Sequence, residues 1–134
     1  MKIEAIEGIG PVFAAKLGEA GVRTTDDLLQ QGASAAGRDR LAAATGLTTG
    51  QLLKWVNHVD LMRLDGVGSE YADLLEAAGV DCCAELARRN PANLATPFAE
   101  LDAARPNWIR RVPGEATVAK WVAQAAAVGK VVTH

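Results

Sequence analysis

The chain has few aromatic residues and no recognisable strand pattern, and both absences restrict its fold. Aromatic residues make up 4% of the 134 residues, and no segment of useful length alternates apolar and polar side chains as a half-buried strand does. Alanine supplies much of the 49% hydrophobic content, which suits closely packed helices. We therefore predict an all-α fold.

Cysteine is also scarce, and long apolar runs are missing. Cys82 and Cys83 are adjacent, which is poor geometry for a structural disulfide and gives no metal-ligand spacing. We interpret Cys83 as a small buried apolar residue. No run approaches the roughly 18 apolar residues of a membrane span, and the N-terminal residues Met1-Lys2-Ile3-Glu4 lack the apolar core of a signal peptide. We expect a soluble cytoplasmic protein with no metal site and no membrane partner.

Residues for catalysis are missing too. His58 falls within an expected long helix and His134 is the last residue, so neither has an evident partner for acid–base or nucleophilic chemistry. We expect a protein that is not an enzyme and has neither a small-molecule substrate nor a cofactor. The net charge of −2, from 14 basic and 16 acidic residues, argues against a generally basic, nucleic-acid-binding surface.

What the chain does contain is an internal repeat. Ile6-Glu7-Gly8-Ile9-Gly10 recurs as Leu64-Asp65-Gly66-Val67-Gly68, and the later LGEAGV ending at Val22 recurs as LEAAGV ending at Val80. The offset is constant, since 66 − 8 and 79 − 21 both give 58. We call residues 8–10 the first glycine turn and residues 66–68 the second glycine turn. Each is predicted to be a tight hairpin leading into a helix.

The repeat predicts the organisation of the chain. We expect a first repeat over residues 1–63 and a second over residues 64–134, sharing one core and joined by a continuous helix over 49–64. The pair Thr24 and Asp27 predicts a capped helix start, and so does the pair Thr48 and Gln51. The offset later grows to 66, because Trp55 corresponds to Trp121, so the second repeat has eight extra residues. They fall between residues 90 and 114, where Asn90-Pro91 and Thr96-Pro97 each predict a helix start.

The whole pattern resembles a bacterial family known as domain of unknown function 4332. The residues that carry the resemblance are Glu7-Gly8-Ile9-Gly10-Pro11, Thr45-Gly46-Leu47, Leu53-Lys54-Trp55-Val56-Asn57, Asp60-Leu61-Met62-Arg63, Gly66-Val67-Gly68, Glu70-Tyr71-Ala72, Leu74-Leu75, Ala78-Gly79-Val80 and Arg89-Asn90-Pro91. The two glycine turns are similar to helix-hairpin-helix motifs. The resemblance implies two helix-hairpin-helix pseudo-repeats in one compact helical domain. The motif class implies sequence-independent contacts to nucleic-acid phosphates, sometimes with a monovalent cation at the hairpin.

The first glycine turn is the candidate phosphate site, formed by Gly8, Ile9, Gly10 and Lys16. The first N–H groups of a helix lack intrahelical partners, the helix dipole is positive there, and glycine lets an anion approach closely. The same glycines are also needed simply to turn the chain, and both interpretations stay open.

The second glycine turn has acidic surroundings. Asp65, Glu70 and Asp73 flank Gly66, Val67 and Gly68. Acids at a helix start stabilise the helix and repel phosphate. We therefore predict a structural role for the second turn.

Basic residues gather elsewhere, around an aromatic residue. The candidate patch comprises Arg88, Arg89, Arg105, Trp108, Arg110 and Arg111. Such a mixture suits nucleic-acid contacts or an acidic protein partner. It is more typical of arginines that cap a helix C-terminus, here Arg88 and Arg89, and of a tryptophan that anchors a loop. The sequence thus leaves two functional hypotheses, a non-catalytic nucleic-acid-binding module and a protein-interaction or self-assembly module.

Overall fold

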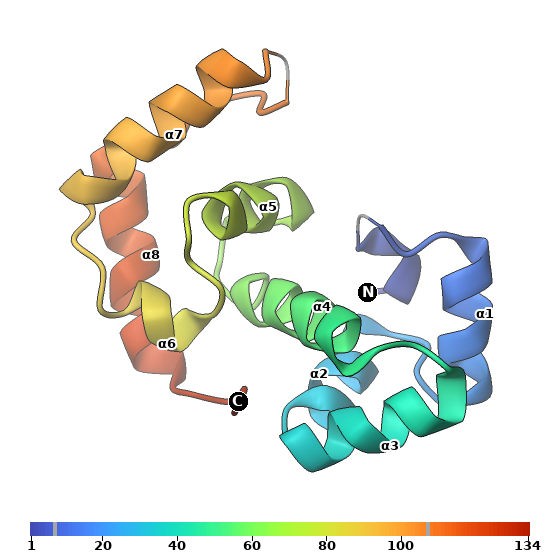
Figure 1. Cartoon of the computed structure of the whole chain (residues 1–134). Coiled ribbons are helices and arrows are strands. Elements are labelled where there is room, and N and C mark those ends of the chain that lie inside the picture. Colours follow the sequence, from blue (N-terminus) through green and yellow to red (C-terminus); the bar gives the residue numbers. More distant parts are fainter. Residues whose placement is uncertain (7, 107) are drawn as a thin grey trace. The chain divides into compact units, whose positions relative to one another are not determined.

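The computed structural model describes residues 1–6, 8–106 and 108–134, so Glu7 and Asn107 lie outside the described residues. The secondary structure of the described residues is helical, with no strand, which confirms the predicted all-α class. Figure 1 shows the elements in chain order: the 3-10 helix η1 (Ile3–Ala5), α1 (Pro11–Glu19), α2 (Thr25–Gly32), α3 (Ala35–Thr45), α4 (Thr49–Leu61), α5 (Ser69–Ala77), α6 (Cys83–Leu86), α7 (Ala92–Ala104) and α8 (Glu115–Val128). Among the described residues, no helix has the length and apolar character needed to cross a membrane.

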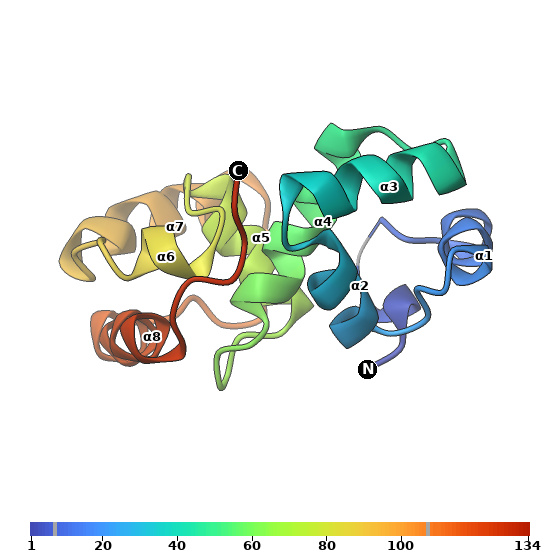
Figure 2. The same cartoon turned by 90° about the horizontal axis from the view of Figure 1, so that it is seen from below.

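The chain divides into two compact units. Unit 1 comprises Met1–Asp60 together with Val131–His134, and unit 2 comprises Leu61–Lys130. The last residues leave α8 as an extended segment (Figure 2) and belong to unit 1. Each unit contains a cluster of buried hydrophobic side chains. The repeat boundary between residues 63 and 64 and the shared core stay predictions.

The start of α2 has the predicted capping box. The Oγ1 atom of Thr24 accepts the N–H of Asp27 at 3.1 Å, and the Asp27 carboxylate accepts the N–H groups of Arg23 and Thr24 at the same distance. These backbone donors hold the pKa of Asp27 below its ordinary value, because they favour the charged carboxylate.

The long helix α4 also begins as predicted, since Thr48 Oγ1 accepts the N–H of Gln51 at 3.1 Å. It ends at Leu61, three residues before the predicted end. There the N–H of Leu64 bonds to the carbonyl of Leu61, three residues back instead of four. This tighter bond turns the chain toward the second glycine turn.

Backbone geometry recurs along with the sequence. Helices α1 and α5 both have nine residues and begin 58 residues apart, at 11 and 69. After α1 the N–H of Val22 donates to Leu17 at 2.8 Å, and after α5 the N–H of Val80 donates to Leu75 at 2.9 Å. The repeated residues therefore make equivalent hydrogen bonds at the ends of these two helices.

The two units differ most before their last helices. Residues 46–48 join α3 to α4, whereas residues 105–114 join α7 to α8; we call residues 105–114 the connector. The predicted helix start at Thr96-Pro97 is wrong, because α7 continues through Pro97. Proline removes one helical donor, but Leu94 and Phe98 on either side of it are fully buried in the core of unit 2. Their packing maintains the helix.

A buried arginine fixes the last residues of the chain within unit 1. Arg38 Nη1 donates to the carbonyls of Gly32 at 2.8 Å and Ala33 at 3.0 Å, and Nη2 donates to the carbonyl of Thr133. The N–H of Thr133 donates to Ala33 at 2.8 Å, and Val132 is 1% exposed. The guanidinium thus caps the end of α2 and holds residues 131–134 against unit 1.

Replacing this arginine should destabilise the protein. Arg38→Leu leaves three carbonyls without their charged donor, so we expect the free energy of unfolding to fall by about 3 kcal/mol. Urea denaturation measures the change. Arg40→Leu is the matched control, because Arg40 lies exposed on the same helix, and it should change the stability by no more than about 0.5 kcal/mol. Equal effects of the two substitutions would contradict the assigned role of Arg38.

Candidate functional site

The first glycine turn buries its middle residue and exposes both glycines. Ile9 lies in the core of unit 1, and its N–H donates to the carbonyl of Ile6 at 3.2 Å. Gly8 and Gly10 are exposed. Gly8 has a φ of +95°, which side chains disfavour. A Cβ atom there would lie 3.7 Å from Nε1 of Trp55, so the indole packs directly against the turn.

Helix α1 begins immediately after this turn without a side-chain cap. Its N-cap is Gly10, followed by Pro11. Because proline has no N–H, the first amides at the helix start are those of Val12 and Phe13. Lys16 is exposed one helical turn beyond Val12. The start of α1 therefore presents backbone amides, with Lys16 on the same helix, and phosphate binding at this turn stays a prediction.

The second glycine turn has the same backbone. Val67 is buried and donates its N–H to Leu64 at 3.1 Å, as Ile9 does to Ile6. Gly66 has a φ of +84°, and a Cβ atom there would lie 3.6 Å from Nε1 of Trp121. Gly68 is the N-cap of α5 and, like Gly10, is extended and exposed.

The surroundings of the two turns differ, because the connector bonds to the start of α5. The carboxylate of Glu70 accepts the N–H of Arg110 at 2.7 Å, and the hydroxyl of Tyr71 donates to the carbonyl of Arg111 at 2.7 Å. At the position of Glu70, the first repeat has Val12, which is 68% exposed. An acid and a bonded chain segment thus lie at the start of α5, and the structural role of the second turn stays a prediction.

The basic candidates fall into two groups in the chain. Arg89 donates to the carbonyl of Ala78 at 3.4 Å, so it caps α5, while its neighbour Arg88 is exposed. In the connector, the guanidinium of Arg105 lies 4.3 Å from the ring centroid of Trp108. Trp108 is half-buried against the core of unit 2. It therefore anchors the connector, as one of the interpretations from the sequence proposes.

A known protein family matches most of the chain. The model of a family described as domain of unknown function 4332 matches residues 7–128. The chain belongs to this family. No curated protein and no solved structure matches the chain. Membership of the domain of unknown function 4332 family assigns no activity to the glycine turns or to the connector.

Sequence reasoning about this family member missed how the connector reaches the second turn. Glu70 and the connector residue Arg110 are 40 residues apart in the chain, as are Tyr71 and Arg111. Nothing in the spacing of these residues predicts their pairing. The acidic residue Glu70 at the start of α5 was the one feature of the sequence that could have indicated this contact.

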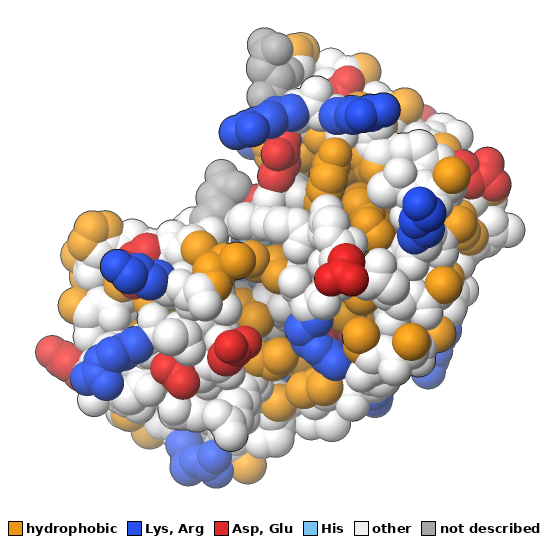
Figure 3. Space-filling view, turned by 180° about the vertical axis from the view of Figure 1, so that it is seen from behind, with side chains coloured by type: hydrophobic (Ala, Val, Ile, Leu, Met, Phe, Trp, Pro, Cys, Tyr) orange, Lys and Arg blue, Asp and Glu red, His pale blue; other side chains and the backbone are white. Residues whose placement is uncertain are grey.

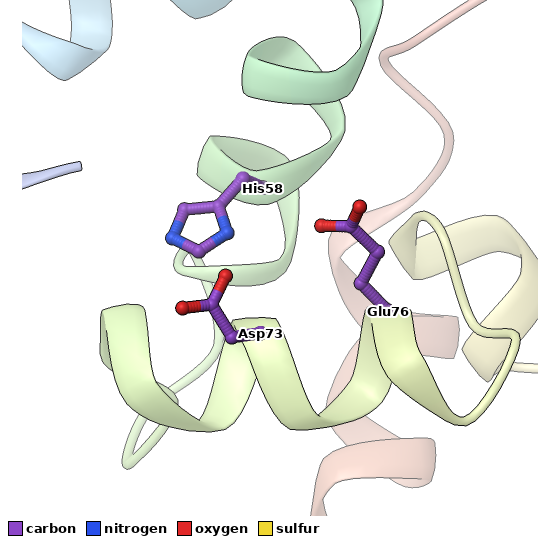
Figure 4. A group of neighbouring side chains, drawn as sticks. All are labelled: His58, Asp73 and Glu76. Carbon is purple, nitrogen blue, oxygen red and sulfur yellow. The ribbon is translucent and has the colours of Figure 1, made fainter. Parts of the chain in front are cut away.

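Figure 4 draws three further side chains that carry metal-ligating atoms, which sequence analysis did not single out as a group. Asp73 and Glu76 are half-buried and lie one turn apart on α5 in unit 2. His58 is buried on α4 in unit 1. All three have interactions within the chain. Two carboxylates of one helix are fewer ligands than a divalent cation normally takes from a protein, so α5 by itself does not make a metal site.

Alanine substitutions should separate the two glycines of the first turn. Gly8→Ala forces a side chain into positive φ and should lower the free energy of unfolding by about 1–2 kcal/mol. Gly10→Ala should have little effect, because Gly10 has a φ of −84° and no heavy atom lies within 4 Å of the place that a Cβ atom would take. Thermal and urea unfolding measure both. Equal destabilisation by the two substitutions would contradict this geometry.

Proposed function

We propose that the protein is a non-catalytic tandem helix-hairpin-helix module that binds the phosphate backbone of nucleic acid through its first glycine turn, independently of sequence. One observation carries the proposal. The same turn occurs twice, but Glu70 at the start of the second helix bonds to the connector, whereas the first helix has the exposed Val12 at the equivalent position. The first turn is therefore the copy without an acid at its helix start.

The physical basis is the start of α1. Its amides have no side-chain cap, and the positive end of the helix dipole favours an anion at that place. Gly8 and Gly10 leave no side chain between an approaching phosphate and the backbone. Lys16 adds an exposed cation on the same helix. The motif class also admits a monovalent cation at the turn, which would bind turn carbonyls and add positive charge.

Charge limits the strength of this binding. The chain has a net charge of −2, and Glu7 directly precedes Gly8 in the sequence. On the face drawn in Figure 3, basic side chains lie among carboxylates and uncharged groups. We therefore expect weak, salt-sensitive binding, with a dissociation constant of roughly 10⁻⁴ to 10⁻⁶ M at physiological salt. As part of the same proposal, we expect the protein to be located in the cytoplasm and to catalyse no reaction.

The alternative is a protein-interaction or assembly module without nucleic-acid binding. The exposed Val12 favours it, because this apolar side chain beside the first glycine turn is 68% exposed. A protein partner could bury it, whereas a phosphate could not. A hetero-complex or a dimer in light scattering, together with no nucleic-acid binding, would support this alternative.

Aspartate substitutions at the two N-caps test the proposal. An N-cap aspartate accepts the first amides of its own helix and adds a negative charge. Gly10→Asp should therefore abolish binding to fluorescent mixed-sequence DNA, single-stranded and duplex, in anisotropy titrations at low salt. It should also raise the free energy of unfolding by a few tenths of a kcal/mol.

Gly68→Asp is the matched control, since Gly68 has the same backbone conformation and charge change in the second turn. It should leave most of the DNA binding intact. Equal loss of binding in the two variants would contradict the role of the first turn, and a wild-type protein that binds neither DNA form at low salt would overturn the proposal.

A further inference from the structure

The connector is fixed by main-chain hydrogen bonds and by buried side chains, among them Ile109. The N–H of Arg110 bonds to Glu70, and the carbonyl of Arg111 bonds to Tyr71. Between these bonds and Trp108, Ile109 is 4% exposed and belongs to the core of unit 2. Residues 108–111 thus have a defined path although they lie outside the helices.

The side chains of Arg110 and Arg111 take no part in this attachment. Arg110 and Arg111 bond to α5 through main-chain atoms, and both residues are exposed. Neither guanidinium has a hydrogen-bond or ion-pair partner among the residues that the structure describes. Two adjacent cations at fixed backbone positions lose less conformational freedom on binding than cations on a loose loop.

The tryptophan of the connector points to phosphates instead of bases as the ligand. Arg105 covers the Trp108 ring at 4.3 Å, and the same ring is half-buried against the core. A base would have to displace the guanidinium before it could stack. Arginine guanidinium groups, in contrast, bind phosphate oxygens through paired N–H donors.

Acidic and basic residues are unevenly distributed along the sequence of unit 2. Residues 61–87 contain one basic and six acidic residues, whereas residues 88–130 contain seven basic and three acidic residues. The acidic part includes the second glycine turn and α5, and the basic part includes the connector. Anion binding in unit 2 is therefore expected at the connector and not at the glycine turn.

We propose that unit 2 contacts the nucleic-acid phosphate backbone through Arg105, Arg110 and Arg111 of the connector, in place of its own glycine turn. The inference rests on the proposed nucleic-acid function, because that function supplies the polyanion. A second phosphate contact on the same chain would raise the affinity of the first by effective concentration.

The double variant Arg110→Gln/Arg111→Gln tests the connector. Its main-chain bonds to Glu70 and Tyr71 remain, so its melting temperature should match that of the wild type. Anisotropy titrations with mixed-sequence duplex and single-stranded DNA over a range of salt concentrations should show weaker binding. The slope of log K against log salt should become shallower by about 0.7–0.9 for each lost phosphate contact, and so by about 1.5 for two.

The control Arg40→Gln/Lys120→Gln makes the same change in net charge at exposed sites outside the connector and the first glycine turn. It should leave the salt slope unchanged. Equal slopes for the two double variants would overturn the connector site. If Gly10→Asp abolishes DNA binding while Arg110→Gln/Arg111→Gln does not weaken it, the inference fails and the proposed function stands.

The converse result, binding lost in Arg110→Gln/Arg111→Gln and kept in Gly10→Asp, would support the connector and contradict the first glycine turn. A wild-type protein that binds no DNA at low salt overturns both. A labelled poly-glutamate peptide that binds as tightly as DNA and depends on the same two arginines would also overturn the inference, because the ligand would then be an acidic protein.

Discussion

The contact between a glycine turn and a tryptophan is the constraint on which each unit depends. Gly8 packs against Trp55 and Gly66 against Trp121, in each case with the glycine at positive φ. Each tryptophan also packs against the ring that follows the turn, Phe13 at 5.4 Å and Tyr71 at 5.2 Å between ring centroids. These contacts fix the start of α1 or α5 against the helix that carries the tryptophan.

The two glycine turns have the same backbone geometry, but the residues around them differ. In unit 1, the residue in the first turn of α1 that corresponds to Glu70 is Val12, whose side chain is exposed. The segment that joins α3 to α4 is short, since it consists of residues 46–48 alone. In unit 2, the first turn of α5 contains Glu70, and the longer connector donates a main-chain hydrogen bond to its carboxylate. A repeat whose two copies are equal in geometry has thus become unequal in what each copy presents to solvent.

Local patterns in the sequence were sufficient for much of the fold. The Thr24 and Asp27 box, the Thr48 cap and the glycine turns depend on residues within a few positions of one another, and all have the expected geometry. Contacts between distant residues were not predictable in this way. Neither the attachment of Arg110 to Glu70 nor that of Thr133 to Arg38 has a local pattern. For the candidate site, the backbone geometry of each turn was therefore foreseeable, whereas the attachment of the connector to α5 was not.

The central claim is that the start of α1 binds phosphate and the start of α5 does not. Two-dimensional ¹H–¹⁵N spectra of the protein, recorded during titration with a short mixed-sequence DNA duplex, test this claim most directly. We predict saturable shifts of the amides of Val12 and Phe13 that clearly exceed those of Glu70 and Tyr71, which lie beside the connector. Equal shifts at the two helix starts, or DNA binding that leaves Val12 and Phe13 unshifted, would contradict the claim.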